Sequence, residues 1–475
     1  MRRISRAIFN QARPALVAPL SLASMPGARV PGTSPLAGSG VRRCAVRTLH
    51  LALAVPLLSG AVHASSLPVL ITTVLEVHPS LRAQKALAAA SQEAISAARW
   101  QFFPTPSVSM EMTANASPHD PVYGAGSNRV TILRLQQPIW TGGRLTAGLN
   151  RAEAGVLVAN AGLEVARQDL ALRVVQTYAD WYSGQAKSVA YDKSLHAHLR
   201  LRQQILQRIE HGVSPASDLT LVAGRIEQTQ AELTTSQAQQ QAALSRLSQL
   251  SGKPVEGATL VLDPSKPLLL LAHAPEHMVE QAQLGSPTVA RLLGTVRIQE
   301  AEMLARKAAL SPEAYVRAER QYGNFSLGSA PPQSRVFVGL SSNFGAGLSS
   351  LSEVSAAQAR LEAAQADVES ARVGLGEQVW GDFVLATSGS ARKVALAASL
   401  RSSQAVSQSW SRQFLAGQKS WLDVMNAARE LAQVEVQMAD LEATQLLLTW
   451  RLAIVVRGVD DSVDSVKSPE MKDAE

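Results

Sequence analysis

The sequence predicts a mainly α-helical protein with a smaller β part, built as two similar halves of one 475-residue chain. Three observations predict this fold class. Segments in the first and second halves resemble one another at a nearly constant spacing. Each half contains a very long stretch with helical periodicity and no proline. Short stretches in which apolar and polar residues alternate precede these helices and are typical of half-exposed strands.

The N-terminal segment, residues 1–64, is predicted to be a secretory signal peptide with a long basic n-region. It contains eight arginines and no lysine or acid, followed by an apolar core from about Leu49 to Val62 and a cleavage site after Ala64. The alternatives are a short buried helix or a membrane anchor, but the apolar run is shorter than the roughly 20 residues that a spanning helix needs. Met25 is an alternative start. Cys44, the only cysteine, would leave with the signal, so no disulfide is expected.

The charge distribution argues against a nucleic-acid partner. The whole chain has a formal charge of +7, but without residues 1–64 it has 37 basic against 38 acidic residues. The mature chain is therefore almost neutral and shows no basic excess for binding phosphate groups.

Internal duplication sets the predicted domain boundaries. The prolines of residues 78–104 match those of residues 286–312, while Gly212 and Gly417 each lie six residues before an aspartate. We expect a first repeat at 65–252, a linker or equatorial segment at 253–282, a second repeat at 283–458 and a polar tail at 459–475.

In the first repeat, residues 68–102 have helical spacing and end before Pro104, which cannot continue a helix. SVSMEMTA, residues 107–114, alternates strictly and predicts a strand, and residues 129–137 predict a second strand. From Gly143 to about Arg208 no proline occurs, and two apolar stripes follow helical spacing. Such a helix would be about 100 Å long and would have neighbours on two sides.

The second repeat is predicted to follow the same order. Strand-like stretches occupy 313–325 and 335–344, and a long helix follows them. Gly374, Gly376 and the SGS stretch at 388–390 weaken this helix, because each internal glycine costs about 0.5 to 1 kcal/mol relative to alanine. A turn and a further helix then complete the repeat.

Four strands per chain cannot close a membrane barrel, because single-chain barrels begin at about eight strands. Their edges would therefore be paired with strands of other copies of the chain. The stretch with Pro138, Trp140, Gly142 and Gly143 is where a strand would become a long helix without leaving the wall, since glycine permits the backbone angles that the turn needs. Trp140 is expected at the membrane boundary.

QPIWTGGR, residues 137–144, resembles the strand-to-helix turn of the TolC family of outer-membrane channel proteins, although Thr141 replaces the usual acidic or amide residue. GVSPASDL at 212–219 and GQKSWLDV at 417–424 are similar to that family's periplasmic tip turns, with Gly212 and Gly417 as turn residues. The resemblance covers about residues 68–458. It implies a homotrimer with a 12-stranded β-barrel in outer-membrane lipid, continued by a 12-helix α-barrel through the periplasm. It also implies a periplasmic adaptor and an inner-membrane ABC exporter or proton-driven pump as partners.

The resemblance also assigns roles at the tip. It implies that Asp423 is a lumen-facing acid at the pore constriction, and that Asp218 and Lys419 belong to a network that holds the tip closed. Asn426 stands where a second acid ring is often found, and Phe414 where a tyrosine can be. The alternative is that Asp218 and Asp423 only cap the helices that start there.

No phosphate loop, nucleophile elbow or catalytic carboxylate pair occurs, so we expect no enzyme activity and no cofactor. His196 and His198 point to different helix faces, and no metal site is expected. The favoured function is a passive exit duct of a tripartite export machine, with type I secretion of a protein such as an adhesin slightly preferred over drug efflux. A soluble periplasmic coiled-coil scaffold is the competing interpretation.

Overall fold

The computed structural model describes residues 66–112, 129–260, 274–324, 331–342 and 345–470. The predicted signal peptide and part of the predicted linker, residues 261–273, lie outside the described residues. The elements follow in the order α1 (Leu67–Val77), α2 (Pro79–Trp100), β1 (Thr105–Met112), β2 (Arg129–Trp140), α3 (Arg144–Glu210), α4 (Ser217–Ser251), η1 (Gly257–Thr259), α5 (Pro275–Gly285), α6 (Pro287–Ala308), β3 (Glu313–Tyr322), β4 (Gln333–Ser341), η3 (Ala346–Leu348), α7 (Ser349–Leu415), α8 (Trp421–Arg457) and α9 (Val459–Glu470).

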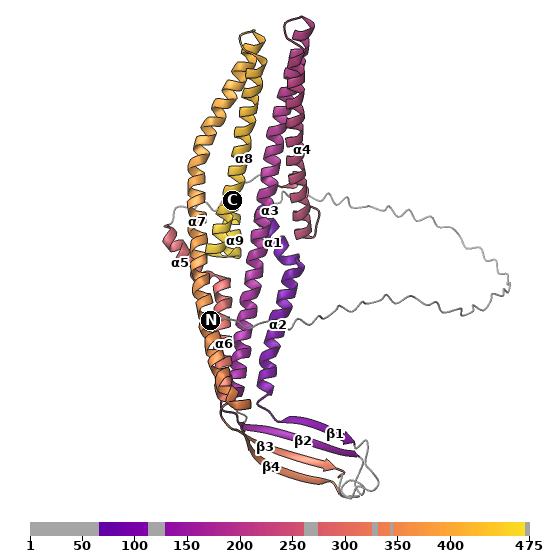
Figure 1. Cartoon of the computed structure of the whole chain (residues 1–475), viewed down its shortest axis with the longest axis vertical. Coiled ribbons are helices and arrows are strands. Elements are labelled where there is room, and N and C mark those ends of the chain that lie inside the picture. Colours follow the sequence, from indigo (N-terminus) through magenta and orange to yellow (C-terminus); the bar gives the residue numbers. More distant parts are fainter. Residues whose placement is uncertain (1–65, 113–128, 261–273, 325–330, 343–344, 471–475) are drawn as a thin grey trace, which may run out of the picture. The chain divides into compact units, whose positions relative to one another are not determined.

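The two halves contain the same main elements in the same order. The series α1, α2, β1, β2, α3, α4 is matched by α5, α6, β3, β4, α7, α8. The helices α3 and α7 have 67 residues each, and they pack against α4 and α8 respectively as two long hairpins (Figure 1). The predicted fold class, mainly α with a β part and two structural repeats, is confirmed.

The helix predicted over residues 68–102 is in fact two helices, α1 and α2, so the expectation of one helix was wrong. The break lies at His78, whose backbone is extended with φ −64° and ψ 130°. Pro79 then begins α2, because a proline at the first helical position has no N–H that needs a partner there. The same break recurs between α5 and α6 at Pro287, where the Ser286 Oγ accepts a hydrogen bond of 3.3 Å from the Val289 N–H.

The glycines predicted to weaken α7 do not interrupt it. Gly389 has a packing role, because a Cβ at this position would lie 2.7 Å from the Nε2 of Gln445 on α8. Gly184 of α3 is packed in the same way, and its Cβ would lie 2.9 Å from the backbone nitrogen of Gln240 on α4. Both glycines and both glutamines are 205 residues apart, so the duplication preserves the same close helix approach in both halves.

The strands form one antiparallel sheet in the order β1-β2-β3-β4, which leaves β1 and β4 as its edges. The sheet continues from the ends of the helices α2, α3, α6 and α7 (Figure 1). A register shift between Pro138 and Trp140 in β2 inserts one extra residue opposite β3. Such a bulge bends the strand just before α3 begins.

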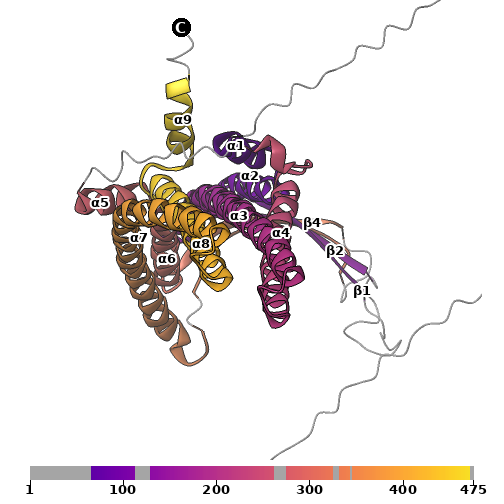
Figure 2. The same cartoon turned by 90° about the horizontal axis from the view of Figure 1, so that it is seen from above.

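The core lies between the helices in three clusters. In the first, Tyr178 and Trp181 of α3 pack with Trp450 of α8, and each is at most 2% exposed. The second joins α5 to α7 and α8 around Met278. The third joins the two hairpins near the tip turns, with Phe414 among its buried members. Because α3 packs against both α4 and α8, it lies between them (Figure 2).

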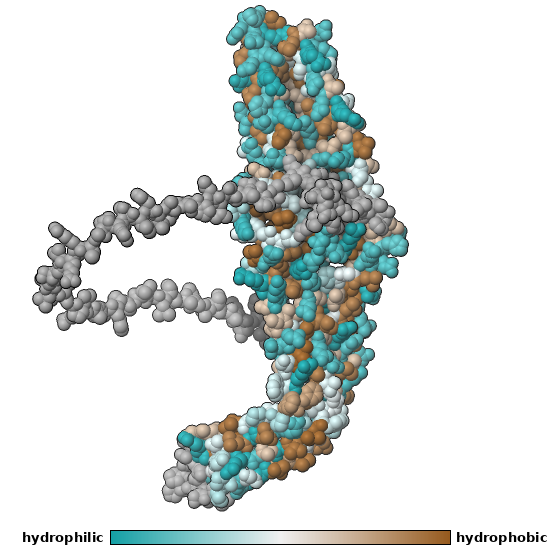
Figure 3. Space-filling model, turned by 180° about the vertical axis from the view of Figure 1, so that it is seen from behind, coloured by the Kyte–Doolittle hydropathy of each residue, from teal (hydrophilic) through white to brown (hydrophobic). Residues whose placement is uncertain are grey.

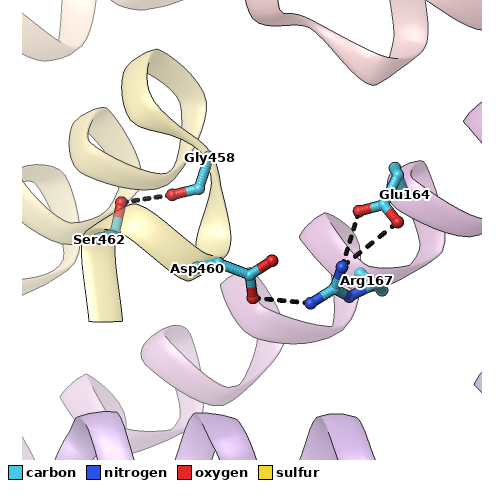
Figure 4. A network of polar contacts seen from close by, with 5 residues as sticks. All are labelled: Glu164, Arg167, Gly458, Asp460 and Ser462. Atoms are coloured by element: carbon cyan, nitrogen blue, oxygen red, sulfur yellow. Dashed lines mark hydrogen bonds and ion pairs between the residues drawn. The ribbon is translucent and has the colours of Figure 1, made fainter. Parts of the chain in front are cut away.

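The predicted polar tail begins with the helix α9. This helix is attached to α3 by Arg167, whose Nη2 donates a 2.7 Å hydrogen bond to Asp460 (Figure 4). The Nη1 of the same guanidinium donates a 3.0 Å hydrogen bond to Glu164. The first turn of α9 is closed by the Ser462 Oγ, which donates to the Gly458 carbonyl.

Candidate functional site

The sheet has one apolar face and one polar face. Val108 of β1 lies opposite Leu133 of β2 in the strand register. Leu135 lies opposite Ala318, and Ala318 lies opposite Val336 of β4. The mainly apolar face therefore carries Val108, Met110, Met112, Leu133, Leu135, Val316, Ala318, Val336, Val338 and Leu340, together with the polar residues Thr131, Gln137, Arg320 and Ser334.

This apolar face is exposed in the single chain. The side chain of Val108 is 71% exposed and that of Val338 is 85% exposed. Figure 3 shows apolar, brown residues gathered on the sheet at the lower end of the view. Exposed apolar patches of this kind mark surfaces that contact lipid or another protein chain.

The opposite face of the sheet is polar and internally paired. The Arg134 Nε donates a 2.7 Å hydrogen bond to Glu319 on the neighbouring strand. Arg317 forms a 3.0 Å ion pair with the same carboxylate, and its guanidinium lies 4.8 Å from the ring centre of Phe337. These charged groups therefore gather on the face opposite the mainly apolar one, although the buried Nε of Arg317 makes no hydrogen bond within the described residues.

The predicted strand-to-helix turn lies between β2 and α3. Trp140 ends β2 and is 50% exposed, whereas the next residue, Thr141, is buried. Gly142 and Gly143 have φ values of +60° and +94°, which favour glycine. A Cβ at Gly142 would also lie 2.6 Å from the Cβ of Ser311, so no other residue fits there without a shift.

Arg144, the first residue of α3, fastens this turn to the neighbouring strand. Its guanidinium pairs with both carboxylate oxygens of Glu313 at the start of β3, and the Nη2 to Oε2 distance is 3.3 Å. Bidentate pairs of this kind fix direction as well as distance.

The matching turn between β4 and α7 was missed by the sequence analysis. Here Gly345 has φ +71°, and Leu348 has φ +63°, which is unusual for a residue with a side chain. The stretch FGAGLSS, residues 344–350, lacks the adjacent glycine pair of the first turn. Only its glycines between a strand and a long helix could have indicated a turn.

The two predicted tip turns have the same hydrogen bonds. Gly212 ends α3 with φ +70° and Gly417 ends α7 with φ +76°. The Val213 N–H donates to the Arg208 carbonyl at 2.8 Å, and the Gln418 N–H donates to the Gln413 carbonyl at 2.9 Å. Each is the six-to-one bond of a Schellman motif, in which the left-handed residue is usually glycine.

Asp423 lies in the first turn of α8 and completes a capping box with Ser420. The Ser420 Oγ accepts from the Asp423 N–H at 3.1 Å, while the carboxylate accepts from the Ser420 N–H at 3.2 Å. Hydrogen bonds from the side chain and the backbone of Ser420 lower the pKa of Asp423, and the charge of Lys419 adds to this effect. The carboxylate is therefore ionised at neutral pH.

The residues of the predicted tip network are not joined to one another within the described part of a single chain. Asp218 lies in the first turn of α4, but its side chain does not cap that helix. The ammonium of Lys419 lies 4.5 Å from the ring centre of Trp410, a contact that holds it on its own hairpin.

A different pair joins the two hairpins near the tip. The guanidinium of Arg208 on α3 lies 4.8 Å from the ring centre of Phe414 on α7. Its Nη1 also donates to the Phe414 carbonyl at 3.5 Å. Phe414 is 3% exposed, so this contact is part of the tip core. The sequence marked Phe414 only as a departure from the family pattern and gave no sign of its partner.

The described residues contain neither a candidate metal site nor a candidate membrane-spanning helix. No group of three or more His, Cys, Asp or Glu side chains in that part of the chain is arranged to hold a metal ion. None of the described helices has both the length and the hydropathy needed to cross a bilayer.

Comparison with known proteins extends the resemblance noted from the sequence. Residues 70–253 match the family described as outer membrane efflux protein. No curated protein matches the chain.

Several solved structures share the fold at low sequence identity. A membrane protein from Pseudomonas aeruginosa is 19% identical, with a TM-score of 0.70 over 82% of this chain and 92% of that chain. The outer membrane protein VceC from Vibrio cholerae is 16% identical, with a TM-score of 0.69 over 82% and 96%. The CmeC outer membrane channel from Campylobacter jejuni is 12% identical, with a TM-score of 0.68 over 85% and 88%.

At these identities the structural likeness shows the fold, and it extends well beyond the matched residues 70–253 into the second half. Residues 70–253 thus match the outer membrane efflux protein family, and the chain as a whole shares the fold of the solved outer-membrane channel structures.

Proposed function

We propose that three copies of this chain form an outer-membrane duct, through which a tripartite export machine passes its substrates. The observation that carries this proposal is the four-stranded sheet, which has one apolar face, one polar face and two unpaired edges in the single chain. Three such sheets joined edge to edge would give twelve strands, with the apolar faces towards lipid and the polar faces towards a water-filled lumen.

The two long hairpins support the second half of the duct. Each chain supplies α3, α4, α7 and α8, so three chains would supply twelve helices below the twelve strands. The strand-to-helix turns at Gly142 and Gly345 keep sheet and helices continuous, with residues 65–252 and 283–458 as the two repeats. Each repeat then provides one sector of the wall.

The proposed partners are a periplasmic adaptor at the tip and an inner-membrane transporter, either an ABC exporter or a proton-driven pump. The chain itself acts passively, because the transporter supplies the energy and the duct supplies the path. The tip turns at Gly212 and Gly417 lie at the ends of the hairpins farthest along the chain from the sheet, where an adaptor would meet the duct.

Small-molecule efflux is the cargo class favoured by the family description, which names efflux. Type I secretion of a protein uses the same architecture and is the second candidate. Deleting the gene should lower the tolerated concentration of dyes, detergents or antibiotics several-fold while the set of secreted proteins is unchanged. Loss of one secreted protein with unchanged tolerance would instead assign secretion.

Membrane fractionation tests the duct itself. The mature protein should sediment with outer membranes and run as a trimer that heating converts to monomer on gels. The Arg317→Gln variant is altered on the polar face and should still form this trimer. It serves as a control for the effect of a substitution in the sheet that does not change the apolar face. Recovery of the chain as a soluble monomer without detergent would favour the periplasmic scaffold and refute the duct.

A further inference from the structure

A cavity of about 120 Å³ lies between α3, α4 and α8, separate from the turns and from Asp423. Its lining includes Tyr191 and His198 of α3, Arg225 of α4 and Arg429 of α8. His198 is 4% exposed, whereas the two arginines are exposed at the rim. The cavity therefore has a buried histidine at its base and two cations at its opening.

The hydrogen bonds around His198 identify which ring nitrogen carries the proton. The Thr229 Oγ1 donates its only hydrogen to the Arg225 carbonyl at 2.9 Å. The same Oγ1 lies 3.2 Å from the Nδ1 of His198, and with its hydrogen on the Arg225 carbonyl we assign it as the acceptor of a hydrogen bond from that nitrogen. The neutral ring then has its lone pair at Nε2, and this atom has no partner among the described residues.

The cations at the rim also lack acidic partners. Arg225 donates a 2.8 Å hydrogen bond to the neutral side chain of Gln228. Arg429 forms no ion pair or hydrogen bond within the described part of the chain. The acid in the lining, Glu232, lies beside Tyr191, where burial and the charge of Glu232 raise the pKa of the Tyr191 phenol. Two guanidinium groups are thus left without an acidic partner, and one buried ring nitrogen is left without a hydrogen bond, within the described part of the chain.

We propose that this cavity binds a small oxyanion that still carries a proton, with hydrogen phosphate as the simplest example. Its charged oxygens would accept hydrogen bonds from Arg225 and Arg429, and its hydroxyl would donate to the Nε2 of His198. Sulfate has the same shape but no proton at neutral pH. It therefore satisfies the arginines and leaves the histidine acceptor unpaired.

Binding would connect the two hairpins. Arg225 belongs to the α3/α4 hairpin and Arg429 to the α7/α8 hairpin, so one oxyanion would tie them together across α3. A ligand that binds only the packed arrangement stabilises it by mass action. The site is independent of the proposed export function, because binding can be measured on the purified protein without transport.

Isothermal titration of the detergent-purified protein with inorganic phosphate and with sulfate tests the proposal. At pH 7.5 we expect saturable phosphate binding, about tenfold tighter than that of sulfate, because leaving a buried acceptor unpaired costs roughly this factor. The Arg429→Gln variant should weaken both anions by about tenfold. Arg412→Gln, which alters an exposed arginine beside a different cavity near the tip, should leave both unchanged.

The His198→Asn variant separates a binding role from a packing role. Its amide N–H can still donate to Thr229, but it has no acceptor in the place of Nε2. The ratio of the sulfate to the phosphate dissociation constant should therefore fall from about 10 to about 1, while the affinity for sulfate stays as in the unaltered protein. Absence of saturable phosphate binding, equal affinity for the two anions, or an unchanged affinity in Arg429→Gln would each overturn the proposal.

Discussion

At the scale of single residues, Asp423 caps a helix and is also the carboxylate that we propose for the pore constriction. The capping box gives it a structural role that needs only the hydrogen bonds with Ser420. The lowered pKa keeps it charged at neutral pH, which is what an electrostatic filter requires. The two roles can be separated, because only one of them needs the negative charge.

Asp423→Ala should reduce the cation preference of the channel in planar bilayers, since it removes one carboxylate per chain from the proposed constriction. Ser420→Ala is the matched control. It removes the cap and costs about 1 kcal/mol of helix stability, but it keeps the charge and should leave the ion preference unchanged. If Asp423→Ala channels keep their ion preference, Asp423 is a capping residue only.

His198 predicts a dependence of stability on pH. Burial lowers the pKa of His198 from 6.5, and the charge of Arg225 adds to the effect. As the pH falls below about 6.5, the unfolded chain takes up a proton that the folded chain does not. The free energy of unfolding should therefore decrease from pH 6.5 downward until the lowered pKa of the folded state is reached.

Thermal unfolding between pH 7.5 and 5.5 checks this expectation. The His198→Asn variant should lose part of the decrease, because asparagine does not titrate. His196→Asn, two residues away with 60% of its side chain exposed, should behave like the unaltered protein. An identical pH dependence for all three proteins would contradict the assignment to His198.

At the scale of the elements, the glycines of α7 differ in what surrounds them. A Cβ at Gly389 would meet Gln445, whose Nε2 lies 3.2 Å from the Ser390 Oγ. A Cβ at Gly374 would meet nothing within 4 Å. The same substitution in one helix should therefore have opposite effects at the two positions.

Gly374→Ala should stabilise the protein by about 0.5 to 1 kcal/mol, because alanine has the higher helix propensity and its Cβ would not clash with any neighbouring atom. Gly389→Ala should destabilise it by about 1 kcal/mol, because Gln445 must move and lose its bonds to α7. Gly184→Ala should cost about 1 to 3 kcal/mol, since here the obstacle is backbone. Thermal or denaturant unfolding measures all three, and a stabilising Gly184→Ala would refute the close approach.

At the scale of the whole molecule, the proposed assembly of copies in lipid depends on the two faces of the sheet. Val108 and Ser109 are neighbours on the edge strand β1 and lie on opposite faces of the sheet. A charge on the lipid side of a barrel costs up to about 2 to 4 kcal/mol per site, and an assembly of three copies would multiply that cost. A charge on the lumen side remains in water.

Val108→Asp should therefore abolish or strongly reduce heat-modifiable trimers in outer membranes, whereas Ser109→Asp should leave them intact. Expression of both variants is first matched by immunoblot of whole cells. If the two variants assembled equally well, the apolar face would not be the lipid-facing surface, and the proposed duct would lose its main support.

Features within one stretch of chain could be predicted from the sequence. The prolines, the alternation around Val108 and the helical stripes of residues 143–208 are local patterns, and the structure has strands and helices at these places. The split at His78 was nevertheless missed. Helical spacing continues across it, and a proline at the first position of a helix looks much like one that ends a helix.

Features that join distant residues could not be predicted in this way. Examples are the contact of Arg208 with Phe414, the approach of Gly389 to Gln445 and the cavity around His198. Each depends on how two or three helices are oriented relative to one another. The residue pattern of any one helix does not indicate this orientation. The second strand-to-helix turn was missed because Leu348 adopts its left-handed backbone without the glycine that usually indicates it.

The sequence by itself determined the kinds of element, their duplication and the position of the first strand-to-helix turn, because periodicity, proline and glycine act on the backbone locally. Only the tertiary structure decided the sheet order β1-β2-β3-β4, the register in which the strands pair and the pairs that join the hairpins. These features depend on packing between segments far apart in the chain, such as Arg134 with Glu319 and Arg208 with Phe414. Many pairings of such segments are compatible with their local residue patterns, and only the contacts between side chains favour one of them.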